Sequence, residues 1–390
     1  MRRWIRFQRD PVQELTRLRL TVGSADDPTS GASPRTALSA TTAGQKRAES
    51  EYPVSETAEP VAHADLAVVT AGSAFLLKID DESGFWLDFE TVSELREHTD
   101  EKIILEKIST LFPGAEPEEA LFRYYLSRAV LYKEYTLPAL PASVHKILVL
   151  SRRFHATLSD YTKVVESDPG LAKGVFRLAN SAAFATASEM HTLPQAVAHV
   201  GVKEVEKIAM AQALGNRMFQ VRQYEPLVRD LTRHSVATAI GAEQMARYCQ
   251  VDPKDAFLAG LFHDCGKLVL LGLIADVQKR RKHAVPDGLI DSAFRAFHLS
   301  IGENACQSWH FPDEVTASVA LHHKPIPTGD TLADSVGLGN VLAHLAETKE
   351  AEFVLAPEDP FKVRLQMTPD QLAGVVGEVR LKWKDYYPDS

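Results

Sequence analysis

The run with the most chemically active side chains in this sequence is His263-Asp264-Cys265-Gly266-Lys267. The apolar segments AFLAGLF and LVLLGLI flank it, which predicts a buried helix. Adjacent histidine and aspartate are costly in an apolar interior unless they are paired or bound to a metal. His234 lies on the preceding predicted helix, and a short connection would make the two helices antiparallel neighbours. Because imidazole and carboxylate groups suit Zn, Fe or Mn, this combination is a candidate metal site.

Further histidines follow along the chain at His298, His310, His322 and His323. A single histidine on an apolar helix face is usually a hydrogen-bonded core residue. Several imidazoles on consecutive helices beside a His-Asp pair favour a metal, although such motifs also arise by chance. Spacing alone leaves both interpretations open.

The elements that would position these residues are helices. Apolar residues recur at helical spacing from Leu137 onward, with no period-two alternation. Cap signals mark several boundaries: Ser167 and Asp168 before Pro169, and a capping box of Thr368 with Gln371. The sequence predicts helices within residues 137–153, 167–184, 192–214, 233–249, 252–274 and 368–383.

The N-terminal part differs in composition. Residues 1–60 are predicted to be a disordered tail, rich in Ser, Thr, Ala, Gly and Pro, although residues 2–20 could also form an amphipathic helix. Residues 61–136 are predicted to form a small α+β module, a structural or sensory appendage with no recognisable chemistry. Its expected strands lie at 65–79 and 84–89, and its expected helices at 101–112 and 117–135.

Bulk properties exclude some classes of protein. The 390 residues carry a formal net charge of -9, which argues against non-specific nucleic-acid binding. Three cysteines without CxxC spacing indicate neither a disulfide framework nor a zinc ribbon, and they fit a reducing compartment. No apolar run predicts a transmembrane segment, and the basic N-terminus lacks the apolar region of a signal peptide. We therefore expect a cytoplasmic protein.

HSVATAIGAEQMARY followed by DAFLAGLFHDCGKLVLL resembles the central signature of the HD superfamily. The flanking segments resemble its HDOD subgroup: LPALPASVHKIL, SDPGLAKGVFRLANSAAF and LPQAVAHVGVKEVEKIAMAQAL upstream, and FHLSIGENACQSWHFPDEVTASVALHHKP downstream. The resemblance covers residues 137–383 and implies a mainly all-α, multi-helical HD-like bundle. It does not extend to residues 1–136.

In catalytic HD enzymes, a histidine, a His-Asp pair and a later aspartate hold a metal that activates water for attack on a phosphoester. The resemblance assigns the first three positions to His234, His263 and Asp264. The fourth position falls on Asn340, whose amide is neutral and a weaker ligand. Asp334 lies about two turns away on the same predicted helix and is a poor substitute.

A second departure concerns the HD-GYP phosphodiesterases, a subgroup that has additional metal ligands. His298, His322 and His323 resemble those additional ligands. The segment HHKPIPTGDT lacks the Gly-Tyr-Pro motif of that subgroup. Lys267 matches a lysine that assists the leaving group in catalytic relatives. Here it could instead pair with a carboxylate at the helix surface.

Asn180 and Ser181 lie near a predicted helix end, where short polar side chains form caps and turns. They are either structural caps, which general experience favours, or contacts to a partner or ligand in an HDOD groove.

The resemblance implies a bacterial signal-transduction protein with a non-catalytic HDOD domain that binds other signalling proteins. No cofactor is expected, although a divalent metal (Fe, Mn, Zn or Mg) stays open. The alternative is a metal-dependent phosphohydrolase or phosphodiesterase acting on a nucleotide. A third hypothesis is a sensor that binds a ligand such as a nucleotide in the former catalytic pocket without turnover.

Overall fold

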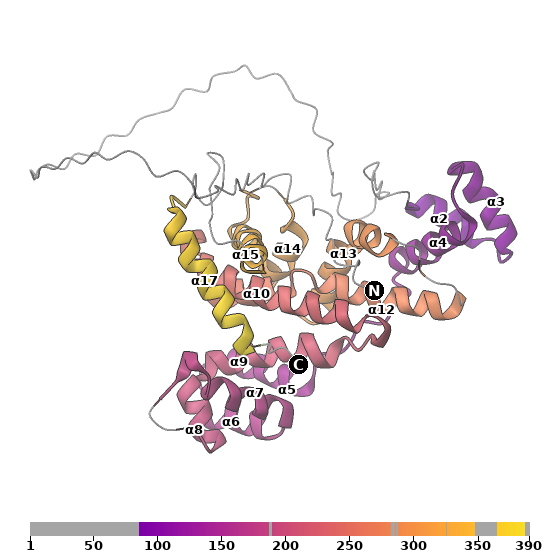
Figure 1. Cartoon of the computed structure of the whole chain (residues 1–390). Coiled ribbons are helices and arrows are strands. Elements are labelled where there is room, and N and C mark those ends of the chain that lie inside the picture. The colour runs from indigo at the N-terminus through magenta and orange to yellow at the C-terminus, as the bar shows by residue number, and fades with distance from the viewer. Residues whose placement is uncertain are drawn as a thin grey trace, which may run out of the picture. The chain divides into compact units, whose positions relative to one another are not determined.

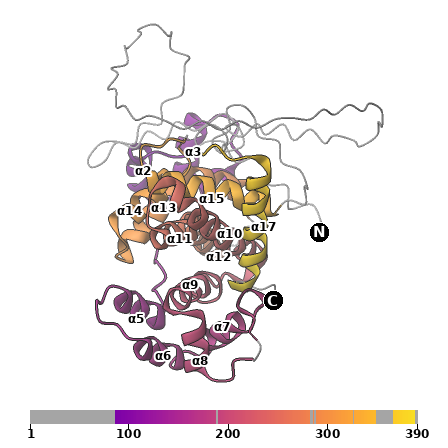
Figure 2. The same ribbon diagram turned by 90° about the vertical axis from the view of Figure 1, so that its left-hand side faces the viewer.

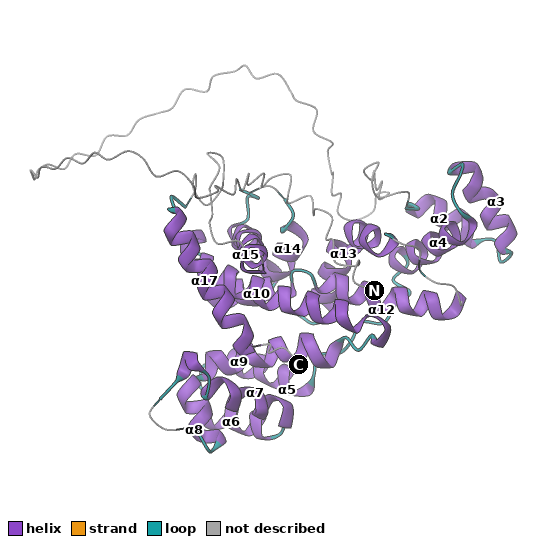
Figure 3. Cartoon of the chain, viewed as in Figure 1, coloured by secondary structure: helices purple, strands orange, loops and turns teal. Residues whose placement is uncertain are grey.

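The computed structural model describes residues 86–186, 189–281, 285, 288–324, 326–347 and 365–386. Within these ranges all regular structure is helical, and Figure 3 shows no strand there, which confirms the all-α prediction. The predicted tail at 1–60 and the predicted strand at 65–79 lie outside the described residues.

The first described helices confirm part of the N-terminal prediction. They are α2 (Phe89–Arg96), α3 (Glu101–Leu111) and α4 (Pro117–Leu131). The strand expected at 84–89 is wrong in its described part, because residues 86–88 have no regular structure and Phe89 begins α2. The reason is local: the Asp88 carboxylate accepts a hydrogen bond from Thr91 N at 2.8 Å and caps the helix.

Trp86 ties this region to the later helices. Its indole Nε1 donates to Ser292 Oγ at 3.0 Å, and its ring packs edge-on against Phe297 with a centroid separation of 4.8 Å. Helix α4 also packs against α12, defined below.

The next helices form one packed group: α5 (Ala142–Ser151), α6 (Leu158–Glu166), α7 (Pro169–Ala179), α8 (Leu193–Val200) and α9 (Val202–Gln212). Asp168 caps α7 by accepting from Leu171 N at 3.0 Å, as predicted. Gly201 separates α8 from α9 with a φ of 83°, a backbone conformation that suits glycine. A π-helical segment, η2 (Ala213–Met218), follows α9.

The remaining helices carry the candidate site. They are α10 (Glu225–Cys249), α11 (Pro253–Phe262), α12 (Cys265–Arg281), α13 (Leu289–Ser308), α14 (Asp313–Leu321), α15 (Thr331–Glu347) and α17 (Pro369–Tyr386). Helix α10 packs against α11, α15 and α17, and α12 packs against α13 (Figures 1 and 2). The predicted capping box opens α17: Gln371 N donates to Thr368 Oγ1, and Thr368 N donates to Gln371 Oε1.

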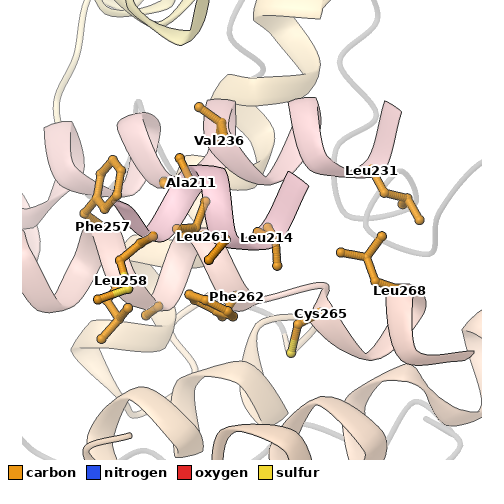
Figure 4. Close-up of a cluster of buried hydrophobic side chains, with 14 of the residues drawn as sticks. Ala211, Leu214, Leu231, Val236, Phe257, Leu258, Leu261, Phe262, Cys265 and Leu268 are labelled. Carbon is orange, nitrogen blue, oxygen red and sulfur yellow. The ribbon is translucent and has the colours of Figure 1, made fainter. Parts of the chain in front are cut away.

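Helix α11 lies in the centre of the hydrophobic core. Figure 4 shows its side chains Phe257, Leu261 and Phe262 among residues of α9, η2 and α10. Phe262 packs edge-on against Trp309 and Phe311. By length and composition, Pro253–Arg281 holds a stretch apolar enough to cross a membrane, but 89% of that stretch is buried inside the protein. It therefore behaves as a core segment of this fold.

Two glycine contacts bring the site helices unusually close. A Cβ on Gly339 of α15 would lie 2.4 Å from the backbone nitrogen of Ala242 on α10. A Cβ on Gly266 of α12 would lie 1.9 Å from the carbonyl oxygen of His298 on α13. These positions allow backbone to meet backbone, so that polar side chains beside them converge from different helices.

Candidate metal centre

The structure brings the predicted His and Asp residues together. His263 and Asp264 occupy the break between α11 and α12, and His298 lies on α13. His322 and His323 follow directly after α14. His234 on α10 lies beside them, its ring centroid 5.4 Å from that of His263.

Backbone carbonyl groups fix the orientation of three of these imidazoles. His263 Nδ1 lies 2.8 Å from Gly260 O, and His322 Nδ1 lies 2.7 Å from Val319 O. His298 Nδ1 makes the same kind of bond to Phe294 O. Each Nδ1 must carry the proton in order to donate, so each Nε2 keeps its lone pair. Metal-binding histidines are commonly held in this way.

The Nε2 atoms point toward Asp264. Those of His298 and His322 lie 3.8 and 3.6 Å from Asp264 Oδ1, and that of His263 lies 3.3 Å from Oδ2. His323 Nε2 is 2.9 Å from His298 Nε2. One ligand atom from each of Asp264, His298, His322 and His323 falls within 4.8 Å of the others, as do those of His234, His263 and Asp264.

The electrostatics of this cluster favour a cation. Burial lowers the pKa of His263 to about 4, against the opposing effect of Asp264. Burial and the Lys267 charge lower the pKa of His298 well below its ordinary value. Neutral imidazole lone pairs therefore face a carboxylate. His263 Nε2, Asp264 Oδ1 and His322 Nε2 are buried and have no hydrogen-bond partner among the described residues. Such acceptors fit a divalent metal, which would supply the missing positive charge.

Lys267 supplies one positive charge at the edge of the cluster. Its Nζ donates to Asp264 Oδ2 at 2.7 Å. Burial raises the pKa of Asp264, but Lys267 and His263 outweigh that effect and hold it well below the usual value. The predicted pairing of Lys267 with a carboxylate is therefore present, and the carboxylate belongs to the site.

His234 is oriented differently from the other histidines. Its Nε2 lies 2.8 Å from Asn340 Oδ1, and its Nδ1 lies 3.4 Å from Glu347 Oε1. Burial lowers the pKa of His234, but Glu347 outweighs this and raises the pKa above its ordinary value. The position predicted for the fourth ligand is thus beside His234, where Asn340 is a hydrogen-bond acceptor.

Three other residues considered from the sequence lie away from this cluster. Asp334 accepts from Thr328 N at 2.7 Å near the start of α15. Asn180 ends α7, where its Oδ1 accepts from Met190 N at 2.8 Å and its Nδ2 donates to Met190 O. Ser181 follows it, and its backbone N donates to Leu178 O. The Asn180 contacts support the structural interpretation, and a ligand role for Asn180 and Ser181 stays a prediction.

Two residues of this region were missed from the sequence: His344 and Glu347. They lie four and seven residues after Asn340 on α15, so all three share a helix face. This spacing was a usable signal, because a residue expected to face a metal site implies that its i+4 and i+7 neighbours face the same way.

The buried neutral histidines predict acid sensitivity of the metal-free protein. His263 titrates near its ordinary 6.5 when unfolded but at about 4 when folded, so the unfolded state binds the extra proton between these values. Stability is then complete above pH 6.5 and falls by about 3 kcal/mol from this group as the pH drops to 4.

Urea unfolding of chelator-treated protein across this pH range measures the effect. His263→Gln should flatten the decline, whereas the exposed His145→Gln should retain it. Equal slopes in His263→Gln and the unaltered protein would contradict the assignment.

Comparison with known proteins assigns part of the chain to a family. The profile of the HDOD domain family matches residues 137–325. An uncharacterised protein of Treponema pallidum (strain Nichols) is 24% identical over 197 residues, which are 48% of this chain and 37% of that protein. The chain therefore spans little more than a third of that curated relative.

Several solved structures match this chain at low sequence identity. A candidate phosphohydrolase from Shewanella amazonensis SB2B is 19% identical, with coverage of 68% of this chain and 96% of that one and a TM-score of 0.48. An HDOD domain protein of unknown function from Geobacter sulfurreducens is 16% identical, with coverage of 67% of this chain and 98% of that one and a TM-score of 0.47. The profile match identifies residues 137–325 of this chain, just under half of its length, as an HDOD domain.

Proposed function

We propose that this chain is a signal-transduction protein whose HDOD domain acts through protein–protein interaction. Its buried His/Asp cluster would be a closed metal centre without catalytic turnover. The observation that carries the proposal is burial: side-chain exposure is 0% for His322, 3% for Asp264 and 5% for His298. Structural metal sites have four protein ligands, whereas catalytic sites keep a position open for water or substrate.

The residue at position 340 supports the same interpretation. Asn340 is 2% exposed and accepts a hydrogen bond from His234 Nε2, so that nitrogen carries a proton and offers no lone pair inward. A metal in the group of His234, His263 and Asp264 would have to break this bond. The two-metal arrangement of a phosphodiesterase is therefore disfavoured.

The surface offers a place for a partner. A groove of about 700 Å³ runs between α5 and the end of α13, and it includes Leu140, Val149 and Trp309 in its lining. Beyond the end of α5, Phe154 is 96% exposed. An apolar groove and a fully exposed aromatic side chain are both features of protein-binding surfaces. We also propose a cytoplasmic location, which the three cysteines support because none of them forms a disulfide and a reducing compartment keeps thiols free.

One observation favours a second candidate, a metal-dependent phosphohydrolase acting on a nucleotide. Asp264 belongs to both groups of close ligand atoms, as a bridging carboxylate in a two-metal site would. A metal held there would lower the pKa of a bound water for attack on a phosphoester. In that function Lys267, whose Nζ is bonded to Asp264, would be free to stabilise the leaving group only after this bond breaks.

A metal and turnover assay separates the two functions. We expect the purified chain, loaded with Zn²⁺, Mn²⁺ or Fe²⁺, to retain metal through His322 but not to hydrolyse bis(p-nitrophenyl) phosphate or a cyclic dinucleotide. His322→Ala should lose the metal held by this cluster, together with thermal stability. Phe154→Ser should keep both and lose signalling output in cells. Metal-dependent hydrolysis that His263→Ala abolishes would establish the enzyme instead.

A further inference from the structure

A second group of ligating side chains lies where α10 meets the C-terminal turn of α15. It consists of His234, His344 and Glu347, each of which places a ligand atom within 4.8 Å of the other two. The resemblance to HD proteins assigns no role to His344 or Glu347. Unlike the buried cluster, this group reaches the surface, with side-chain exposure of 11% for His234, 27% for Glu347 and 43% for His344.

The distances in this group suit a metal better than direct hydrogen bonds. Glu347 Oε1 lies 3.4 Å from His234 Nδ1, and Glu347 Oε2 lies 3.9 Å from His344 Nδ1. Two ligand atoms bound about 2.1 Å from a tetrahedral zinc ion are about 3.4 Å apart. The centroids of the two imidazole rings are 4.5 Å apart, and the ring planes are inclined by 34°.

Asn340 sets the tautomer that this group requires. Because Oδ1 of the amide accepts only, His234 Nε2 must carry a proton in the 2.8 Å bond. A neutral His234 then has its lone pair on Nδ1, the nitrogen that faces Glu347. A carbonyl oxygen that accepts from the second ring nitrogen is the usual support of a metal-binding histidine. The asparagine that weakens the inner site therefore orients His234 outward.

We propose that His234 Nδ1, His344 and Glu347 form a binding site for a borderline divalent cation of the Zn²⁺ class, with Asn340 as a positioning residue. Two imidazoles and one carboxylate favour Zn²⁺ or Co²⁺ over Mg²⁺ and Ca²⁺, which prefer oxygen ligands. The fourth position is open to water at the surface. This site is separate from the cluster around His322, and the proposal holds whether or not that cluster is filled or catalytic.

Zinc titration of the full-length, metal-stripped chain tests the site, with a competing chelator to set the free concentration and elemental analysis to count bound metal. His344→Gln and Glu347→Gln should each lose one zinc equivalent or bind it at least tenfold more weakly. The exposed residues His145 and Glu378 provide matched controls, and His145→Gln and Glu378→Gln should bind zinc as the unaltered chain does. Unaltered stoichiometry and affinity in both His344→Gln and Glu347→Gln would overturn the proposal.

A second comparison separates this site from the inner cluster. The inner cluster is the buried group of Asp264, His298, His322 and His323. His322→Gln removes one of its ligands, so a chain with this substitution should bind one zinc equivalent, at the outer site. Adding His344→Gln should remove that zinc equivalent. Should His322→Gln not fold, the comparison in the unaltered background decides. If zinc does not bind to the inner cluster, the closed metal centre proposed above is contradicted. The one zinc equivalent expected at His234, His344 and Glu347 would still be bound.

Asn340 has its own test. Asn340→Leu removes the acceptor without removing a ligand, and it should weaken zinc binding at the outer site by about 10- to 100-fold. Asn340→Asp keeps an acceptor oxygen and should restore most of the affinity. Circular dichroism and urea unfolding report whether each variant folds. A folded Asn340→Leu protein with unaltered zinc affinity would overturn the positioning role.

Discussion

Gly266→Ala is expected to destabilise the protein by about 3 kcal/mol, because it inserts a methyl group where two helices meet through their backbones. The new Cβ would lie 1.9 Å from His298 O and 2.8 Å from Gly302 N. A flexible side chain could move aside, but these backbone atoms can move only if α12 and α13 separate. Separation would also draw His298 away from Asp264, so we expect weaker metal binding along with lower stability.

Helix α12 provides the matched control at Gly272. A Cβ at that position would meet no atom within 4 Å, and the residue lies inside the same helix. Gly272→Ala should therefore raise stability by up to about 1 kcal/mol through helix propensity. Urea unfolding of both variants measures the difference. Similar stabilities for Gly266→Ala and Gly272→Ala would show that the close approach of α12 and α13 is wrong.

In a His344→Gln background, which lacks the site at the end of α15, Asp264→Asn is expected to abolish the response of stability to metal. The carboxylate is the one negatively charged ligand among the buried residues, and it belongs both to the group with His298, His322 and His323 and to the group with His234 and His263. Metal at about 1,000 times its dissociation constant stabilises a folded protein by about 4 kcal/mol. Chelator should remove that stabilisation from His344→Gln and remove little from the double variant with Asp264→Asn.

A buried aspartate outside the cluster serves as the control. Asp334 is 4% exposed, against 2% for Asp264, and it holds the backbone of Thr328 at the start of α15. Asp334→Asn should lower stability in the presence and absence of chelator by similar amounts, because it leaves the metal ligands in place. In that background, a chelator response as large with Asp264→Asn as without it would exclude Asp264 as a ligand.

The contribution of Lys267 can be separated from that of the metal by a double-mutant cycle. Asp264→Asn and Lys267→Met should be strongly non-additive in metal-free protein, because their side chains form a 2.7 Å ion pair with limited exposure. Additive effects would indicate that this ion pair contributes no net stability, in which case Lys267 would be available for another role.

Asn340 connects the two metal groups through one hydrogen bond. The amide oxygen holds a proton on His234 Nε2, which disfavours inward ligation and leaves Nδ1 facing Glu347 and away from the inner cluster. An aspartate at this position could accept the same hydrogen bond from His234 Nε2 or bind a metal directly. His234 could then bind a metal either in the inner cluster or in the group with Glu347. The difference between amide and carboxylate therefore decides where His234 can act.

The sequence by itself determined the helices and most of the residues in the inner cluster. Apolar spacing and cap residues are local signals, so the Asp168 cap and the Thr368–Gln371 capping box appear as predicted. The His-Asp pair stood out because two polar groups inside an apolar segment need partners. Local signals misled at residues 86–89, where a pattern typical of a strand is interrupted by the cap at Asp88.

Tertiary structure decided which nitrogen atoms face one another and which carboxylates they meet. Carbonyl groups of the preceding turns fix the tautomers of His263 and His322, whereas Asn340 from another helix is the nearest partner of His234 Nε2. The roles of His344 and Glu347 depend on how closely α15 approaches α10, which Gly339 permits. Helix periodicity specifies the face that a residue occupies, but the distance between two faces depends on how the helices cross, and only the folded chain fixes that distance.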